Sequence, residues 1–152
     1  LRSMTKFYGI PGIRLGYLVG STPLLKQLNR YKEPWTVNAL AQKIGVACAA
    51  DERFAARTRR FVDSERDYLF TRLQSISGLQ PRPSSTNYLL VKITRGGLSS
   101  AKLYEKLARQ GILVRDCRSF RDMGNRFIRV AVKRRSDNRR LLAALQQVVG
   151  GK

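Results

Sequence analysis

Residues 3–16 read SMTKFYGIPGIRLG and bring a hydroxyl, an amine and a guanidinium into one glycine-containing segment. Ser3 precedes Lys6 by three residues, and Arg14 follows Lys6 by eight. A carbonyl cofactor is held as an imine by a primary amine, which Lys6 can supply. A phosphorylated cofactor also needs an anion-binding group, and the Ser3 hydroxyl with the rigid donor fork of Arg14 answers that need. We expect Gly9 and Gly12 to let the backbone turn so that the three side chains reach one small molecule.

An alternative for this segment stays open, in which Lys6 is a surface lysine and Arg14 a charge beside an exposed strand. Nucleotide-binding classes are disfavoured. Gly9, Gly12 and Gly16 do not spell the GxGxxG pattern of dinucleotide-binding proteins, and the sequence has no Walker-type phosphate loop.

The length and composition are those of a single soluble domain. The chain has 152 residues, of which 43% are hydrophobic. No apolar run approaches the roughly 20 residues that a membrane span requires, so we expect no membrane partner. Leu1 is not an initiator methionine, and the first residues already lead into the Lys6 segment. We therefore expect the chain to be part of a longer protein.

Cysteine and histidine usage narrows the chemistry. Cys48 and Cys117 are the only cysteines, and the sequence has no histidine. Neither a zinc site nor a histidine-based catalytic group can be assembled from this composition, so we expect no metal. Two widely separated cysteines also lack the spacing of a disulfide framework. We expect free thiols and a cytoplasmic location.

The charge balance raises a hypothesis of another class, a basic nucleic-acid-binding module. The chain has 30 Lys and Arg against 10 Asp and Glu, a net charge of +20. Its basic residues are nevertheless spread along the sequence, with short clusters only at Arg57, Arg59 and Arg60 and at Lys133, Arg134 and Arg135. Solvated helix faces explain this distribution, and so would an acidic surface elsewhere in a longer protein. We expect no nucleic-acid partner.

Hydrophobic periodicity and turn residues predict an α/β protein. In the first half we expect a strand at 13–19, a helix capped by Thr22 that ends near residue 31, a helix at 37–50 and a long amphipathic helix at 51–76. In the second half we expect a loop at 80–86, strands at 87–93, 112–114 and 127–132, a helix at 101–110, and a last helix capped by Ser136 and ended by Gly150. This order predicts helices packed on one sheet.

The spacing S-x-x-K, then seven residues, then Arg, an apolar residue and Gly resembles the cofactor-lysine motif of fold type I pyridoxal-phosphate enzymes, the aspartate-aminotransferase-like group. The resemblance extends over essentially all 152 residues. It implies that Lys6 forms the Schiff base with pyridoxal 5′-phosphate and that Ser3 and Arg14 bind the cofactor. It also implies that residues 1–50 are the tail of a large cofactor-binding domain and residues 51–152 a small C-terminal domain.

Within this group, the segments KEPWTVNALAQ and ILVRDCRSF are most similar to the threonine-phosphate decarboxylases of cobalamin biosynthesis, with histidinol-phosphate aminotransferases as near relatives. The resemblance implies that Arg129, in FIRVAV, binds the substrate carboxylate and that Arg115 binds its phosphate. Two alternatives stay open. Arg129 could be an edge-strand residue that points to solvent, and Asp116 could pair with Arg115 or with Arg118.

The same resemblance implies an activity and an assembly. The expected parent enzyme is a homodimer that converts L-threonine O-3-phosphate to (R)-1-aminopropan-2-yl phosphate and carbon dioxide. The runner-up reaction is transamination of the histidinol-phosphate type. Family members carry the aspartate on the pyridine nitrogen and the ring-stacking aromatic upstream of the lysine, so we expect this chain to be inactive alone.

Overall fold

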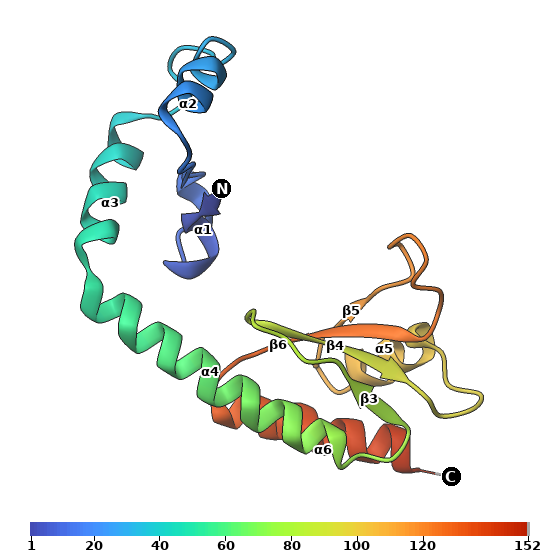
Figure 1. The fold of residues 1–152 in the computed structure, drawn as a ribbon. Coiled ribbons are helices and arrows are strands. Elements are labelled where there is room, and N and C mark those ends of the chain that lie inside the picture. The colour runs from blue at the N-terminus through green and yellow to red at the C-terminus, as the bar shows by residue number, and fades with distance from the viewer. Residues whose placement is uncertain (152) are drawn as a thin grey trace. The chain divides into compact units, whose positions relative to one another are not determined.

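The structure is a computed structural model that describes residues 1–151 (Figure 1). The chain forms two compact units, Leu1–Thr58 and Arg59–Lys152. Each unit is described by itself. The expected domains, 1–50 and 51–152, meet close to this division, at the start of helix α4 (Glu52–Gln74).

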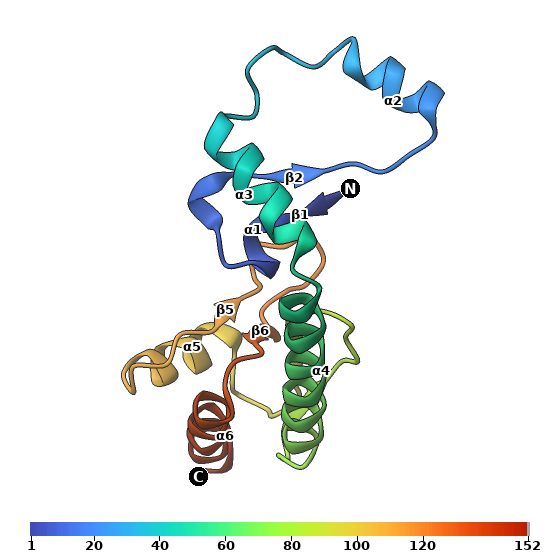
Figure 2. The ribbon, with the colours of Figure 1, turned by 90° about the vertical axis from the view of Figure 1, so that its left-hand side faces the viewer.

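The first unit is built from short elements around the Lys6 segment. In chain order they are β1 (Arg2–Ser3), α1 (Met4–Phe7), the 3₁₀ turn η1 (Pro11–Ile13), β2 (Gly16–Tyr17), α2 (Thr22–Asn29) and α3 (Ala39–Ala50). Strands β1 and β2 pair antiparallel, with Ser3 opposite Gly16 (Figure 2). Helix α3 begins at its N-cap Asn38, whose side chain accepts a hydrogen bond from the backbone N–H of Ala41.

The strand expected at 13–19 is shorter in the structure, where β2 covers only Gly16–Tyr17. Ile13 belongs to the 3₁₀ turn that Pro11 begins, and Arg14 has a left-handed backbone with φ of 53°. A left-handed residue cannot continue a strand, so extended pairing starts only at Gly16. The next expected helix is displaced by one residue, because Ser21 and not Thr22 occupies its N-cap position.

The second unit is a small sheet covered by helices. After α4 come β3 (Leu79–Pro81), β4 (Tyr88–Ile93), α5 (Ser100–Ala108), β5 (Arg115–Asp116), β6 (Phe127–Ala131) and α6 (Arg135–Gly150). The four strands are all antiparallel, in the order β3-β4-β6-β5. This arrangement confirms the predicted sheet with helices packed on it.

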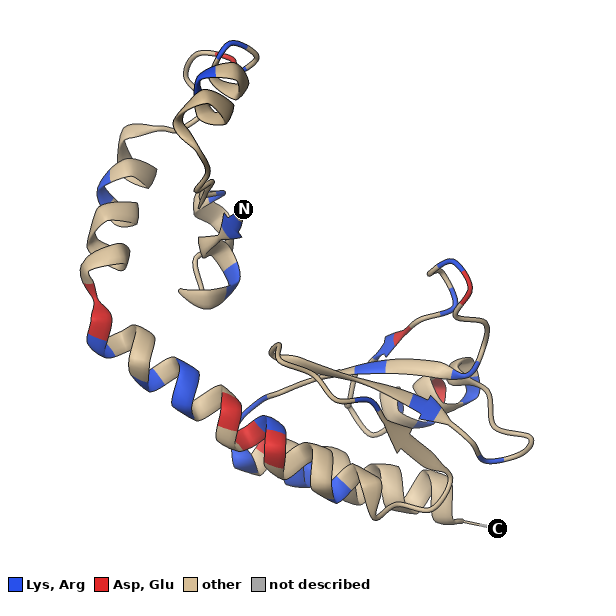
Figure 3. Cartoon of the chain, in the orientation of Figure 1, with Lys and Arg blue, Asp and Glu red and all other residues tan. Residues whose placement is uncertain are grey.

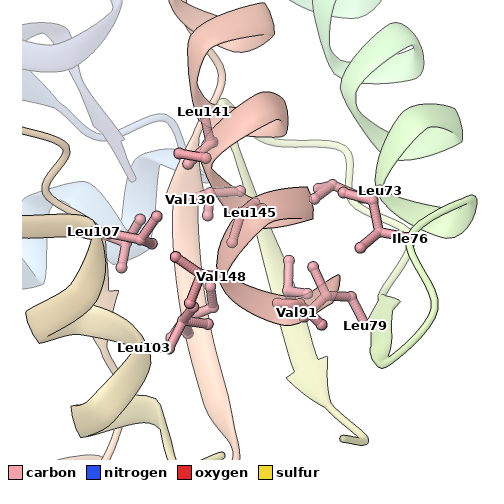
Figure 4. Packing of buried hydrophobic residues seen from close by; sticks show 14 of the residues in the cluster. Leu73, Ile76, Leu79, Val91, Leu103, Leu107, Val130, Leu141, Leu145 and Val148 are labelled. Atoms are coloured by element: carbon pink, nitrogen blue, oxygen red, sulfur yellow. The ribbon is translucent and has the colours of Figure 1, made fainter. Parts of the chain in front are cut away.

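Alternation of side chains along β4 and β6 gives the sheet two different faces. Leu89, Val91, Ile128 and Val130 are fully buried on one face and pack with apolar residues of α4, α5 and α6. Figure 4 shows this core with Leu73, Ile76, Leu79, Val91, Leu103, Leu107, Val130, Leu141, Leu145 and Val148 labelled. The face opposite the core carries the residues at alternate positions of the same strands, and we call it the open face.

Three boundaries in the second unit differ from expectation. The segment 112–114 is not a strand, and the short strand is instead Arg115–Asp116, which pairs with β6. Strand β3 lies where a loop was expected. Its Pro81 lacks a backbone N–H, and a strand tolerates this because β3 is at the edge of the sheet. Helix α6 starts after Arg134 rather than at a Ser136 cap, and Gly150 is its last residue.

A polar network joins α4 to α6 within the core region. The Glu65 carboxylate is buried and accepts two hydrogen bonds from the Arg135 guanidinium, at 2.9 and 3.0 Å. The Asn138 amide donates a third, at 2.9 Å. These donors lower the pKa of Glu65, with the Arg135 hydrogen bond as the largest cause. These hydrogen bonds compensate for the loss of hydration that the Glu65 carboxylate undergoes when it is buried.

Among residues 1–151, no helix combines the length and the apolar composition needed to cross a membrane.

Candidate functional site

Lys6 lies in a tight turn that the structure builds from β1, α1, η1 and β2. Ser3 is the N-cap residue of α1 and Lys6 stands three residues later, so both belong to one helical turn. The backbone N–H of Met4 donates to the carbonyl of Leu15 at 3.0 Å, which closes the turn beside Arg14. Ser3, Lys6 and Arg14 are all exposed. The structure thus places the three predicted residues in one small segment. There the Ser3 hydroxyl forms a hydrogen bond with the Thr5 hydroxyl at 2.8 Å, and the Arg14 guanidinium donates one to the Pro11 carbonyl at 3.5 Å.

Gly16 is the glycine on which this turn depends most closely. A Cβ at Gly16 would lie 2.7 Å from the carbonyl oxygen of Arg2, on the paired strand. Gly9 has a φ of +66°, which other residues rarely adopt. A Cβ at Gly12, by contrast, would meet no atom within 4 Å. The expectation that Gly12 is needed for the turn is therefore wrong, and Gly16 takes that role together with Gly9.

An aromatic cluster fixes the residues directly after Lys6. The ring of Tyr8 stacks on Phe54 of α4, with centroids 5.6 Å apart and planes at 20°. Phe7 meets Tyr8 edge to face at 4.9 Å. Asp51 caps α4 by accepting a hydrogen bond from the Phe54 N–H at 2.8 Å. The cluster ties α1 to the start of α4, a contact that periodicity alone did not predict.

Arg129 lies in the middle of the sheet of the second unit. Strand β6 pairs with β4 on one side and with β5 on the other, so the interpretation of Arg129 as an edge-strand residue is wrong. Its neighbours Ile128 and Val130 point into the core, and Arg129 is half-buried on the open face. The Arg129 guanidinium carbon lies 4.7 Å from the centroid of the Tyr88 ring.

Arg115 is the cross-strand partner of Arg129. The two residues are paired in the register of β5 and β6, so both side chains project from the open face. Arg115 is exposed, donates a hydrogen bond to the Ser119 hydroxyl at 3.2 Å, and lies 5.6 Å from the centroid of the Phe120 ring. Within residues 1–151 neither arginine forms an ion pair. Two uncompensated cations side by side have the charge that an anionic ligand would neutralise.

Asp116 does not neutralise Arg115. Its carboxylate accepts hydrogen bonds from the Ser100 hydroxyl at 2.8 Å and from the Arg118 guanidinium at 2.6 Å. Burial raises the pKa of Asp116, but these bonds and one from the Arg118 backbone N–H outweigh it, so the pKa lies below its ordinary value. Of the two pairings left open by the sequence, the structure shows the one with Arg118. Asp116 joins β5 to the first turn of α5 and leaves Arg115 without an ion pair among residues 1–151.

Lysine and arginine residues elsewhere are dispersed. Figure 3 shows them on helices, strands and loops of both units. Cys48 and Cys117 are free, and burial raises the pKa of the Cys117 thiol, which keeps it in its unreactive neutral form.

Comparison with known proteins places these features in a family. Residues 1–145 match the family of class I and II aminotransferases. The chain belongs to this family. This match confirms the expected fold class. Threonine-phosphate decarboxylases and aminotransferases of this family depend on pyridoxal phosphate, which confirms the expected cofactor of the family.

Three relatives illustrate the match. A Caldanaerobacter subterraneus subsp. tengcongensis protein that carries the provisional name threonine-phosphate decarboxylase is 44% identical over 146 residues, covering 96% of this chain and 39% of that protein. The histidinol-phosphate aminotransferase of Methanosphaera stadtmanae is 30% identical, covering 98% of this chain and 41% of that protein. The crystal structure of the histidinol-phosphate aminotransferase from Clostridium acetobutylicum has a TM-score of 0.90 at 27% identity, covering 99% of this chain and 45% of that one.

The chain therefore spans about two fifths of the length of the curated relatives it matches. Identity is higher to the decarboxylase, whereas the TM-score describes a backbone that both reaction types share. Sequence identity is the better guide to substrate here, because fold alone does not determine function.

Proposed function

We propose that the full-length protein is a pyridoxal-phosphate-dependent decarboxylase of L-threonine O-3-phosphate that forms (R)-1-aminopropan-2-yl phosphate and carbon dioxide, as cobalamin biosynthesis requires. The observation that carries the proposal is the pairing of Arg115 with Arg129 on the open face of the sheet. The 44% identity to a protein provisionally named threonine-phosphate decarboxylase supports the choice of substrate.

The two arginines suit a substrate with two anionic groups. L-Threonine O-3-phosphate carries a carboxylate and a phosphate separated by a short chain, and a guanidinium binds either group through two parallel hydrogen bonds. We assign the carboxylate to the half-buried Arg129 and the phosphate to the exposed Arg115, which has more room for the larger group. One substrate then neutralises both charges.

The residues around Lys6 fit the cofactor. An accessible primary amine, a neighbouring hydroxyl and a guanidinium lie in one turn whose close backbone approach depends on Gly16. We propose that Lys6 holds the aldehyde carbon of pyridoxal phosphate and that Ser3 and Arg14 bind its phosphate. When bound, the cofactor supplies an electron sink that accepts the electron pair of the breaking carbon–carbon bond.

The roles of this chain's residues follow from that chemistry. Arg129 holds the carboxylate so that the bond to be broken stays in a fixed orientation, and Arg115 holds the other end of the substrate. The Nζ amine of Lys6 could carry a proton, and we propose that it returns one to the α-carbon after carbon dioxide leaves.

Transamination of the histidinol-phosphate type is the second candidate, supported by the 30% identity to the histidinol-phosphate aminotransferase of Methanosphaera stadtmanae. The same lysine and arginines would serve it, with proton removal in place of bond cleavage to the carboxylate. An assay of the full-length protein separates the two. The decarboxylase proposal predicts stoichiometric carbon dioxide release from L-threonine O-3-phosphate without 2-oxoglutarate. Amine transfer that requires 2-oxoglutarate, without carbon dioxide, would overturn it.

We also propose that the full-length protein is a cytoplasmic homodimer that does not bind nucleic acid. The free thiols of Cys48 and Cys117 support a reducing compartment, and the dispersed basic residues argue against a nucleic-acid-binding surface. Sedimentation of the full-length protein tests the homodimer, and a gel shift titrated with salt tests the absence of nucleic-acid binding.

A further inference from the structure

We propose that Tyr88 is a positioning residue that orients the Arg129 guanidinium for the carboxylate of the substrate. The inference rests on the proposed function, because it assumes that Arg129 receives that carboxylate. It adds a residue that neither the motif spacing nor the family match singles out.

The geometry begins with the register of β4 and β6. Leu90 is directly opposite Arg129, and Tyr88 is opposite Ala131, so Tyr88 and Arg129 are diagonal neighbours on the open face. Long side chains reach each other across such a diagonal. The guanidinium carbon of Arg129 stands 4.7 Å from the centre of the Tyr88 ring, within the range of a cation–π contact.

Nothing else in the described part of the chain directs this guanidinium. Arg129 forms neither a side-chain hydrogen bond nor an ion pair within residues 1–151, and the side chain of Leu90 has no polar atom. Arg115, on the other side, repels it. The Tyr88 ring lies on the β4 side, away from Arg115, so attraction by the ring and repulsion by Arg115 favour the same placement of the guanidinium.

A guanidinium placed over the face of a ring can keep its donors available. Its N–H groups lie in the plane of the group, so a ring that covers one face leaves the edge free for a bidentate carboxylate. A carboxylate that binds a preoriented arginine avoids the entropic cost of ordering a flexible side chain. Tyr88 remains 38% exposed, which makes it a surface residue whose replacement leaves the core intact.

The test uses the full-length enzyme with its cofactor and compares three variants. Tyr88→Phe keeps the ring, whereas Tyr88→Leu removes it. Tyr104→Leu is the matched control, because Tyr104 is similarly exposed at 37% but lies on α5, which packs on the core face. We expect Tyr88→Leu to lower kcat/KM for L-threonine O-3-phosphate roughly 5- to 30-fold. Tyr88→Phe and the Tyr104 control should stay within about twofold of wild type.

A second readout separates positioning from general damage. The product of the reaction retains the phosphate but lacks the carboxylate, so its inhibition constant should be the same in Tyr88→Leu and wild type. In an Arg129→Gln background, Tyr88→Leu should have no further effect.

The inference is overturned if Tyr88→Leu matches wild type, if Tyr88→Phe is as impaired as Tyr88→Leu, or if product inhibition weakens as much as substrate turnover. These outcomes presuppose an active wild type. A wild-type enzyme that neither binds nor decarboxylates L-threonine O-3-phosphate refutes the proposed function, and the Tyr88 inference with it.

Discussion

Arg115 and Arg129 stand directly opposite each other on antiparallel strands of one sheet, and within residues 1–151 no carboxylate pairs with either. Two like charges at this spacing destabilise a sheet by about 0.2–1 kcal/mol. Asp116, the nearest acidic residue along the chain, bonds instead to Ser100 and Arg118. Asp116 therefore does not relieve the repulsion between Arg115 and Arg129. An anionic ligand bound to both arginines would relieve it.

Replacing one of these arginines should improve stability while impairing function. For Arg115→Gln we expect the free energy of unfolding to rise by about 0.5 kcal/mol, because the cross-strand repulsion is removed. The same change should lower kcat/KM for L-threonine O-3-phosphate roughly 10- to 100-fold, through loss of charged hydrogen bonds to the phosphate. Denaturant unfolding and steady-state kinetics of the full-length protein measure the two effects.

Arg82→Gln is the control for that experiment, because Arg82 is exposed and its side chain has no described partner. Both quantities should stay at the wild-type value in this variant. Equal losses of activity in Arg82→Gln and Arg115→Gln would show that net charge, and not the paired site, governs substrate binding.

Cofactor affinity should depend on Gly16 and not on Gly12. Gly16→Ala would force a Cβ against the Arg2 carbonyl oxygen at 2.7 Å, so β1 and β2 must separate and the turn that carries Ser3 and Lys6 must shift. We expect the dissociation constant of pyridoxal phosphate to rise about tenfold. Gly12→Ala meets open space and should leave it unchanged. Absorbance titration of the apo full-length protein measures both, and equal affinity in the two variants would contradict the described turn.

The Glu65 network should give stability a characteristic pH dependence. Because its hydrogen bond from Arg135 lowers the pKa of Glu65 below the ordinary value of 4.5, the unfolded state binds a proton more readily than the folded state. The contribution of Glu65 is therefore present above pH 4.5 and is lost as the pH falls through the depressed folded pKa. Glu65→Gln should lower the free energy of unfolding at pH 7 by about 1 kcal/mol, since solvent screens the half-exposed Arg135.

The difference in unfolding free energy between wild type and Glu65→Gln should shrink below pH 4.5. Urea denaturation at a series of pH values measures it. A difference that stays constant from pH 7 to pH 3 would mean that the Glu65 carboxylate is not held in its charged form by these bonds.

Local spacing and periodicity predicted much of the fold. The offsets among Ser3, Lys6 and Arg14 are short, so backbone connectivity already limits how far apart they lie. Helix α5 and strand β6 follow from strong periodicity with clear caps or alternation. The errors lie at boundaries such as Arg14 and segment 112–114, where a left-handed residue or a neighbouring strand decides the conformation.

The contacts around Arg115 and Arg129 depend on the register between strands, which could not be predicted from the sequence. Arg115 and Arg129 could each be named from the resemblance, but their pairing follows only once β5 aligns with β6. The same holds for Tyr88, which becomes a neighbour of Arg129 through the β4–β6 register. Gly16 could have been found earlier, because a glycine inside an expected strand, here 13–19, often marks a close approach of another backbone.

The claim that Lys6 holds the cofactor is tested most directly by covalent trapping. The full-length protein is loaded with pyridoxal phosphate, reduced with borohydride so that the imine becomes a stable amine, digested and mapped by mass spectrometry. The account predicts a single stoichiometric phosphopyridoxyl group on Lys6. A stoichiometric group on any other lysine, or loading that survives unchanged in Lys6→Ala, would contradict it.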